Sequence, residues 1–177
     1  MRRVFAMVAL ATSLLSAGCA VSNSVTGRAT KEIPAELFDP CTLPDDALRK
    51  VNVDPATVEP DFVGVHFTDW EVCSWEADWY YVTVAATAEV TVEEFGARPR
   101  TTDFRPAEIG TRDAYTFRST AETQGGLCDL VYPSSQGTVM FRADIKGTEL
   151  LREEGPPQDP CAVVLHTAAI LDPFIPY

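Results

Sequence analysis

Four cysteines constrain the fold of this chain more than any other feature. Cys41, Cys73, Cys128 and Cys161 lie at least 32 positions apart along the sequence. An even set of well-separated cysteines indicates disulfides in a chain that folds outside the cytoplasm, where such bonds persist. Zinc sites instead use close pairs such as C-x2-C with histidines nearby, so a zinc site is the weaker alternative. Four cysteines can pair in three ways, and their spacing does not choose among them.

The N-terminus indicates where the chain folds. Arg2 and Arg3 precede the apolar stretch Val4–Leu15, three small residues follow that stretch, and Cys19 comes directly after them. A basic start, a short apolar stretch and small residues before a cleavage site are typical of a secretory leader. A cysteine at the first position after the leader is typical of a lipoprotein, in which it carries diacylglycerol. We therefore expect lipidation of Cys19 and a lipid-anchored protein on the extracytoplasmic face of the cell membrane.

Two other interpretations of this segment are weaker. A transmembrane helix needs about 20 apolar residues, and this stretch is shorter. A plain secretory signal that happens to contain a cysteine is the second alternative, because Ser16 occupies the position where such lipoprotein motifs most often have Leu. The lipoprotein interpretation divides the chain into a signal peptide at 1–18, a polar flexible tether at 19–37 and a single globular domain at 38–177.

The charge of the chain excludes one class of partner. Removal of the leader takes Arg2 and Arg3 away, so 12 basic residues remain against 26 acidic ones and the net charge changes from −12 to −14. Nucleic acid is a poor partner for such a chain, because phosphate binding needs clustered Lys and Arg. The same charge opposes docking on anionic lipid headgroups. Attachment to the membrane is therefore expected through the N-terminal lipid alone.

The pattern of the remaining chain predicts an α+β domain. Alternating or β-branched segments predict five strands, at 71–77, 80–86, 109–118, 127–132 and 139–145. Asp39 and the Asp159-Pro160 pair are placed to cap an N-terminal and a C-terminal helix, and residues 91–95 carry a capping box typical of a short helix. Turns are predicted at 124–126 and 134–137, and residues 55–69 have no regular pattern. We therefore expect an antiparallel sheet of about five strands covered on one face by the two terminal helices.

Several short motifs occur in a characteristic order along the whole chain. The leader ending at Cys19 is followed by Phe38-Asp39-Pro40-Cys41-x-Leu43, by Cys73-Ser74-Trp75, by single cysteines at Cys128 and Cys161, and by a closing Ile175-Pro176. In this order they resemble a family of actinobacterial cell-envelope lipoproteins that is catalogued as a domain of unknown function. The resemblance implies a cell-envelope address and intramolecular disulfides, and it carries over no catalytic residue. It implies that Cys41 pairs with Cys73, which leaves Cys128 to pair with Cys161.

Motifs for enzymatic chemistry are absent from the sequence. The chain contains neither G-x-S-x-G nor H-E-x-x-H, and its two histidines, His66 and His166, lie a hundred positions apart. Four acidic residues gather around the first predicted strands and could supply the carboxylate pair of a small extracytoplasmic hydrolase: Asp69, Glu71, Glu76 and Asp78. Ordinary solvent-facing acids produce similar groups in so acidic a chain. We therefore predict no catalytic residue, no metal and no cofactor, with the hydrolase as the alternative.

Aromatic residues are concentrated between positions 62 and 81. Trp75 shares a strand face with Cys73 and is expected in the core beside a disulfide. Trp70, Trp79 and Tyr81 are harder to bury together with it, and exposed Trp and Tyr are enriched where proteins grip ligands or partners. These three side chains are our candidate binding residues, with burial in the core as their alternative. The sequence thus favours a non-enzymatic binding module of the cell envelope, whose ligand is a wall glycan, a lipid or an exported protein.

Overall fold

A computed structural model describes residues 37–61, 65–120, 126–150 and 153–177. The predicted signal peptide, Cys19 and the predicted tether up to residue 36 lie outside the described residues, as do positions 124 and 125 of one predicted turn. Within the described ranges, no helix is long and apolar enough to cross a membrane.

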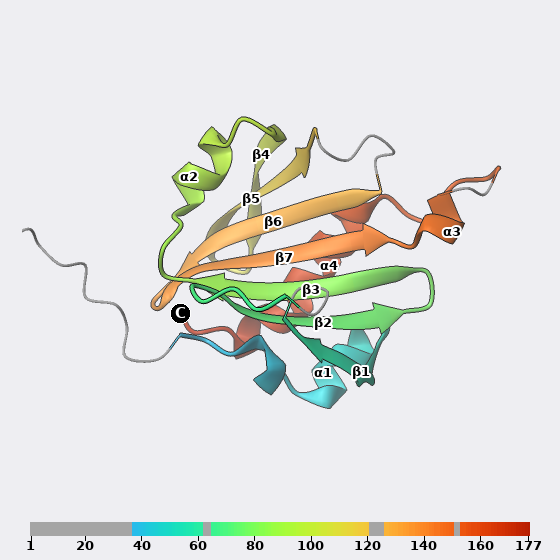
Figure 1. The fold of residues 1–177 in the computed structure, drawn as a ribbon, viewed down its shortest axis with the longest axis horizontal. Helices are drawn as coiled ribbons and strands as arrows, with labels where there is room; N and C mark the ends of the chain where they lie inside the picture. The colour runs from blue at the N-terminus through green and yellow to red at the C-terminus, as the bar shows by residue number, and fades with distance from the viewer. Residues whose placement is uncertain (1–36, 62–64, 121–125, 151–152) are drawn as a thin grey trace, which may run out of the picture. The chain divides into compact units, whose positions relative to one another are not determined.

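Seven antiparallel strands form one sheet in the order β1-β2-β3-β7-β6-β5-β4 (Figure 1). Hairpins join β2 to β3, β4 to β5 and β6 to β7, while the segment from β3 to the far edge at β4 contains a short helix, α2 (Val92–Ala97). The strands are β1 (Val53–Pro60), β2 (Glu71–Ala77), β3 (Tyr80–Thr87), β4 (Thr101–Ile109), β5 (Arg112–Ser119), β6 (Leu127–Ser134) and β7 (Gly137–Ile145). The α+β class and the antiparallel sheet agree with the prediction from sequence.

The prediction of about five strands was wrong, because it did not include the two edge strands, β1 and β4. β1 and β4 contain Pro55, Pro60 and Pro106, and proline in a sheet is confined to edges, strand ends and bulges because it donates no ladder hydrogen bond. Both strands are also mostly exposed and have a shifted register, so neither alternates regularly. In β4 the shift surrounds Asp103, whose φ is +54°. Part of the segment 55–69, which shows no regular pattern in the sequence, is therefore the edge strand β1.

One face of the sheet carries the main core. Helices α1 (Asp45–Lys50) and α4 (Pro160–Leu171) pack on this face, and Figure 1 shows α4 behind the central strands. Asp39 caps η1 (Pro40–Thr42), because its side chain accepts a hydrogen bond from the backbone N–H of Cys41. Asp159 caps α4 in the same way and accepts from the backbone N–H of Cys161. Trp75 is 2% exposed on this face, which places it in the core as expected.

Two cysteine pairs tie helical segments to this core face. Cys41 in η1 is joined to Cys73 in β2, with their Cα atoms 5.3 Å apart. Cys128 in β6 is joined to Cys161 in the first turn of α4, with a Cα separation of 5.0 Å. Both separations suit a disulfide. They are the two pairs that the resemblance implies.

The opposite face carries a smaller apolar cluster. Helix α2 (Val92–Ala97) begins with a capping box between Thr91 and Glu94, as its sequence predicts, and places Phe95 at the centre of this cluster with no exposed surface. The ring of Phe95 lies 5.8 Å from that of Phe117 in β5. Because α2 is short, it covers only part of this second face.

The C-terminus is held by one buried arginine. After α4 the chain forms η2 (Asp172–Phe174) and an extended end. Arg112, at the start of β5, donates from Nε to Asp172 (2.7 Å) and from its two terminal nitrogens to the carbonyl oxygens of Pro133, Pro176 and Ile175. Its side chain is 5% exposed. The short helix α3 (Gly147–Leu150) lies between β7 and α4 in the sequence.

Candidate functional site: a groove beside Trp70

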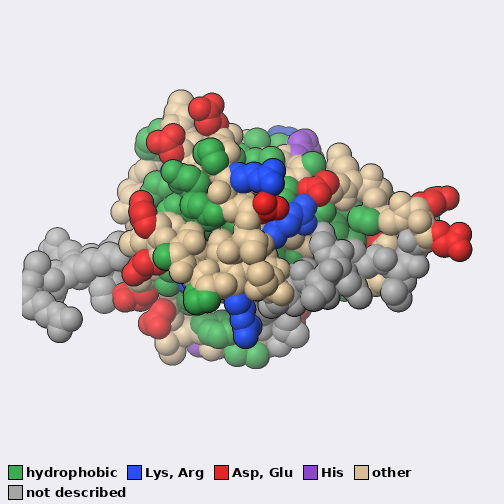
Figure 2. Space-filling model, turned by 90° about the horizontal axis from the view of Figure 1, so that it is seen from above, with side chains coloured by type: hydrophobic (Ala, Val, Ile, Leu, Met, Phe, Trp, Pro, Cys, Tyr) green, Lys and Arg blue, Asp and Glu red, His purple; other side chains and the backbone are tan. Residues whose placement is uncertain are grey.

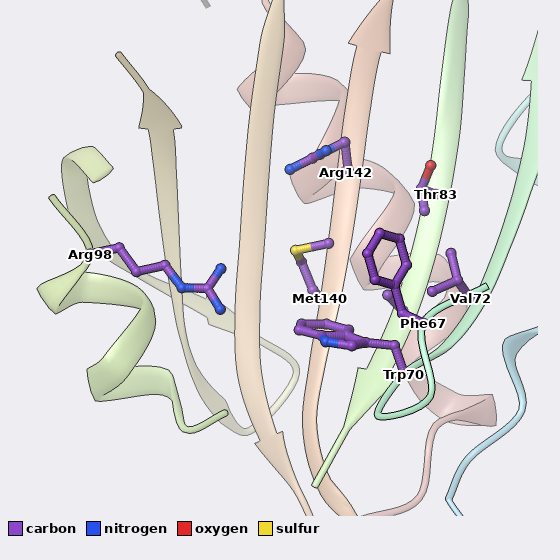
Figure 3. A pocket seen from close by; sticks show the side chains of 8 residues that line it. Phe67, Trp70, Val72, Thr83, Arg98, Met140 and Arg142 are labelled. Atoms are coloured by element: carbon purple, nitrogen blue, oxygen red, sulfur yellow. The ribbon is translucent and has the colours of Figure 1, made fainter. Parts of the chain in front are cut away.

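The part of the second face that α2 leaves uncovered forms a groove of about 250 Å³. We call it the Trp70 groove. Its apolar floor comes from β2, β3 and β7, one wall comes from the loop before β2, and the other comes from the end of α2 (Figure 3). The lining residues are Phe67, Trp70, Val72, Thr83, Ala85, Arg98, Met140 and Arg142.

The floor follows from strand alternation and register. Val72 pairs with Ala85, and Ala85 pairs with Met140, so these three side chains form one row across β2, β3 and β7. Thr83 pairs with Arg142 two residues further along these strands, on the same face. Since residues two apart share a face of a sheet, all five side chains point away from the main core.

The aromatic wall is formed by a tight turn before β2. The Trp70 N–H donates to the Phe67 carbonyl oxygen (3.1 Å), which closes the turn and directs both side chains to the groove. Trp70 is half-buried and meets Phe95 edge to face, with ring centroids 6.0 Å apart. Phe67 is 46% exposed. Large apolar side chains that are this exposed beside a hollow favour an apolar ligand over solvent.

Arg98 reaches into the groove from the opposite side. It is the residue that ends α2, and its guanidinium carbon lies 4.1 Å from the centroid of the Phe95 ring. This cation–π contact holds an otherwise exposed cation next to an apolar surface. Within the part of the chain that the structure describes, Arg98 forms no ion pair with a carboxylate.

A second cation at the groove is neutralised by a buried carboxylate. Arg142 in β7 donates to both carboxylate oxygens of Asp129, the residue directly opposite in β6, at 2.7 and 3.2 Å. Burial raises the pKa of Asp129, which is 1% exposed, and the guanidinium groups of Arg142 and Arg98 oppose that rise. Burial lowers the pKa of Arg142, but the nearby carboxylate of Asp129 raises it, and the net effect is a rise. The pair therefore adds polarity to the groove with no net charge.

The groove has the chemistry of a binding site. Its one hydroxyl, on Thr83, is hydrogen-bonded to the Ser74 hydroxyl (2.8 Å) and has no base beside it among the described groove residues. Over the described ranges, no three side chains of His, Cys, Asp or Glu lie together as metal ligands would. What the groove offers a ligand is apolar surface, two aromatic rings and the charge of Arg98.

The structure does not bring the three predicted aromatic residues together. Trp70 lies at the groove, directly before β2, while Trp79 lies in the turn after β2, about 25 Å further along at the usual rise per residue. Trp79 is half-buried and packs against the ring of Tyr80 (4.6 Å) beside a separate hollow that His166 also lines. Tyr81 is 40% exposed on the groove's face, and Lys146 lies over its ring (5.1 Å).

The predicted acidic group is divided in the same way. Asp69 and Glu71 lie before and at the start of β2, where they line a second hollow together with Trp70 and Glu89. Glu76 and Asp78 lie at the other end of β2. Glu76 is paired with Lys146 (3.2 Å). All four side chains are exposed. The four acids therefore do not form one group in the structure.

His66 belongs to the loop that carries the aromatic wall. Its Nδ1 lies 2.7 Å from a carboxylate oxygen of Asp61, and its side chain is 66% exposed. It does not line the Trp70 groove. This position suits a loop contact and gives the histidine no role at the groove floor.

The comparisons with known proteins identify a family. A protein-family model described as "Protein of unknown function (DUF3558)" matches residues 14–173. The chain belongs to this family. Comparison with curated proteins and with solved structures gives no significant match. Membership in DUF3558 thus leaves the function to be argued from the groove.

Sequence reasoning missed Arg98, Met140 and Arg142 as groove residues. A signal for Arg142 was present, because the turn at residues 134–137 sets the hairpin register and places Asp129 opposite Arg142. A facing pair of opposite charges in two mostly buried strands marks a polar position on the second face. No such signal exists for Arg98, because its place depends on how α2 folds back over the sheet.

Proposed function

We propose that this DUF3558 protein is a lipid-anchored, extracytoplasmic binding module whose ligand site is the Trp70 groove. The observation that carries the proposal is the exposed ring of Phe67 at the edge of a groove with an apolar floor. Phe67 is 46% exposed although Val72, Ala85 and Met140 next to it are buried. An apolar ligand would remove this surface from water and gain the usual hydrophobic free energy.

The groove favours a small apolar ligand over the other partners suggested by the sequence. Its volume of about 250 Å³ lies just below the usual range of ligand pockets, about 300 to 1,000 Å³. A protein partner normally buries a much wider surface. A glycan presents many hydroxyl groups, and the floor offers few polar partners for them. A lipid or similar molecule that inserts one apolar group is the best match, and the anchor at Cys19 would hold the module near such molecules.

Binding of N-phenyl-1-naphthylamine, an uncharged dye that fluoresces in apolar sites, tests this proposal. We expect saturable binding to the purified protein. Phe67→Ala should raise Kd roughly five- to tenfold, because truncating a well-packed aromatic contact costs more than about 1 kcal/mol. Phe174→Ala is the matched control, since Phe174 is 42% exposed in η2 and does not line the groove. Absent dye binding, or equal effects of the two variants, would contradict the proposal.

A further inference from the structure

The charges around the Trp70 groove indicate what kind of apolar ligand it takes. Of the two arginines that line it, Arg142 is held by Asp129, and the two charges cancel. Arg98 brings a positive charge that no carboxylate of the described residues pairs with. Arg98 therefore places a positive charge at the edge of an apolar floor.

This local charge is opposite to that of the protein as a whole. The chain has a net charge of −12, and Figure 2 shows acidic side chains along the rim of the face seen from above, with basic and acidic side chains side by side near its middle. An extended anionic membrane surface is repelled by the net negative charge of the protein. A single small anion in the groove meets Arg98 at short range, where a direct contact outweighs distant, screened charges.

We infer that the ligand of the Trp70 groove is a small anionic amphiphile, whose apolar group lies between Phe67, Trp70 and Met140 and whose carboxylate, sulfonate or phosphate contacts Arg98. This inference rests on the proposed function and adds the charge of the ligand to it. Arg98 suits this role because a guanidinium offers five N–H donors that match a planar or tetrahedral anion. The ring of Phe95 beneath it limits its freedom before the ligand arrives.

A pair of dyes with the same aromatic skeleton isolates the charge. 8-Anilino-1-naphthalenesulfonate differs from N-phenyl-1-naphthylamine by one sulfonate group. We expect Arg98→Gln to raise the Kd of the sulfonate dye about three- to tenfold more than the Kd of the neutral dye. This factor lies between the loss expected for an exposed ion pair and the loss expected for a charge-assisted hydrogen bond. Arg105→Gln removes the same charge at an exposed residue outside the groove, paired with Asp103, and should leave the ratio unchanged.

The two dyes distinguish a failure of the anion inference from a failure of the proposed binding site. If the neutral dye binds and depends on Phe67, but Arg98→Gln leaves the ratio of the two dissociation constants unchanged, the groove is a binding site and the anion inference is wrong. If the neutral dye does not bind, the proposed function itself fails. If Arg98→Gln fails to fold, Arg98→Lys replaces it as the test variant, because lysine keeps the positive charge. It should retain most of the sulfonate preference, and a complete loss there with the neutral dye still bound would overturn a role for the charge.

Discussion

Replacing Arg112 with methionine tests how the C-terminus is held in place. The substitution removes a side chain that is 5% exposed together with its four hydrogen bonds, and it leaves Asp172, 17% exposed, without its cation. It also removes a cation that lies 5.0 Å from the ring of Tyr132 and 4.4 Å from that of Tyr177. Methionine fills part of the space but satisfies none of the oxygen acceptors.

The expected loss in the free energy of unfolding is about 3 kcal/mol. Removing one partner of a buried ion pair costs about 3 to 5 kcal/mol, and the lower end applies because the last residues can move outward and expose their carbonyl groups to water. For a domain of this size the loss corresponds to a fall in Tm of roughly 10 °C. Thermal unfolding followed by far-UV circular dichroism under oxidising conditions measures this fall.

Arg105→Met is the matched control for this prediction. Arg105 also donates to an aspartate, Asp103, at 2.8 Å, but its side chain is 72% exposed. Exposed ion pairs contribute little to stability, so its Tm should stay close to that of the wild type. If Arg112→Met melts at the wild-type temperature, or if both variants lose the same amount, the contacts of Arg112 do not hold this end of the chain.

The predicted leader, the cysteine pairs and the buried ion pair can each be tested by experiment. Labelled palmitate should enter the wild type and be lost in Cys19→Ala, with release of the protein into the medium, and labelling that survives the substitution would refute the anchor. Non-reducing peptide mapping should recover Cys41 with Cys73 and Cys128 with Cys161, and a peptide joining Cys73 to Cys128 would overturn the pairing. Because burial raises the pKa of Asp129, its contribution to stability should fall as pH rises from about 4 through the raised pKa. In urea unfolding from pH 4 to 8, the wild type should lose stability relative to Asp129→Asn as the pH rises, and a relative gain would show that Arg142 controls this carboxyl.

Local patterns predicted the central strands and the helix caps well. β2, β3, β6 and β7 are buried strands joined by short turns, so their β-branched and aromatic residues have the expected periodicity. The caps at Asp39, Thr91 and Asp159 depend on hydrogen bonds between near neighbours in the sequence. Such features are determined within a few residues and can be read from them.

Edge strands and the Trp70 groove depend on longer-range contacts. β1 and β4 become strands because β2 and β5 offer them hydrogen-bonding partners, not because of their own proline-containing sequences. The predicted strand at 109–118 began too early for a related reason: Gly110, with a φ of +60°, forms the turn that separates β4 from β5. The groove combines a loop, the end of a helix and three strands, so only Trp70 among its residues was a candidate from sequence.

The tryptophan indole signals in an NMR titration test the central claim most directly. The chain has three tryptophans, so a ¹H–¹⁵N spectrum contains three indole N–H signals that single substitutions can assign. Trp70 lines the groove, Trp75 is buried in the core and Trp79 lies at the far end of β2. Titration with N-phenyl-1-naphthylamine should shift the signal of Trp70 and leave those of Trp75 and Trp79 in place. A shift confined to Trp79 would move the binding site to the other end of the sheet and contradict the account.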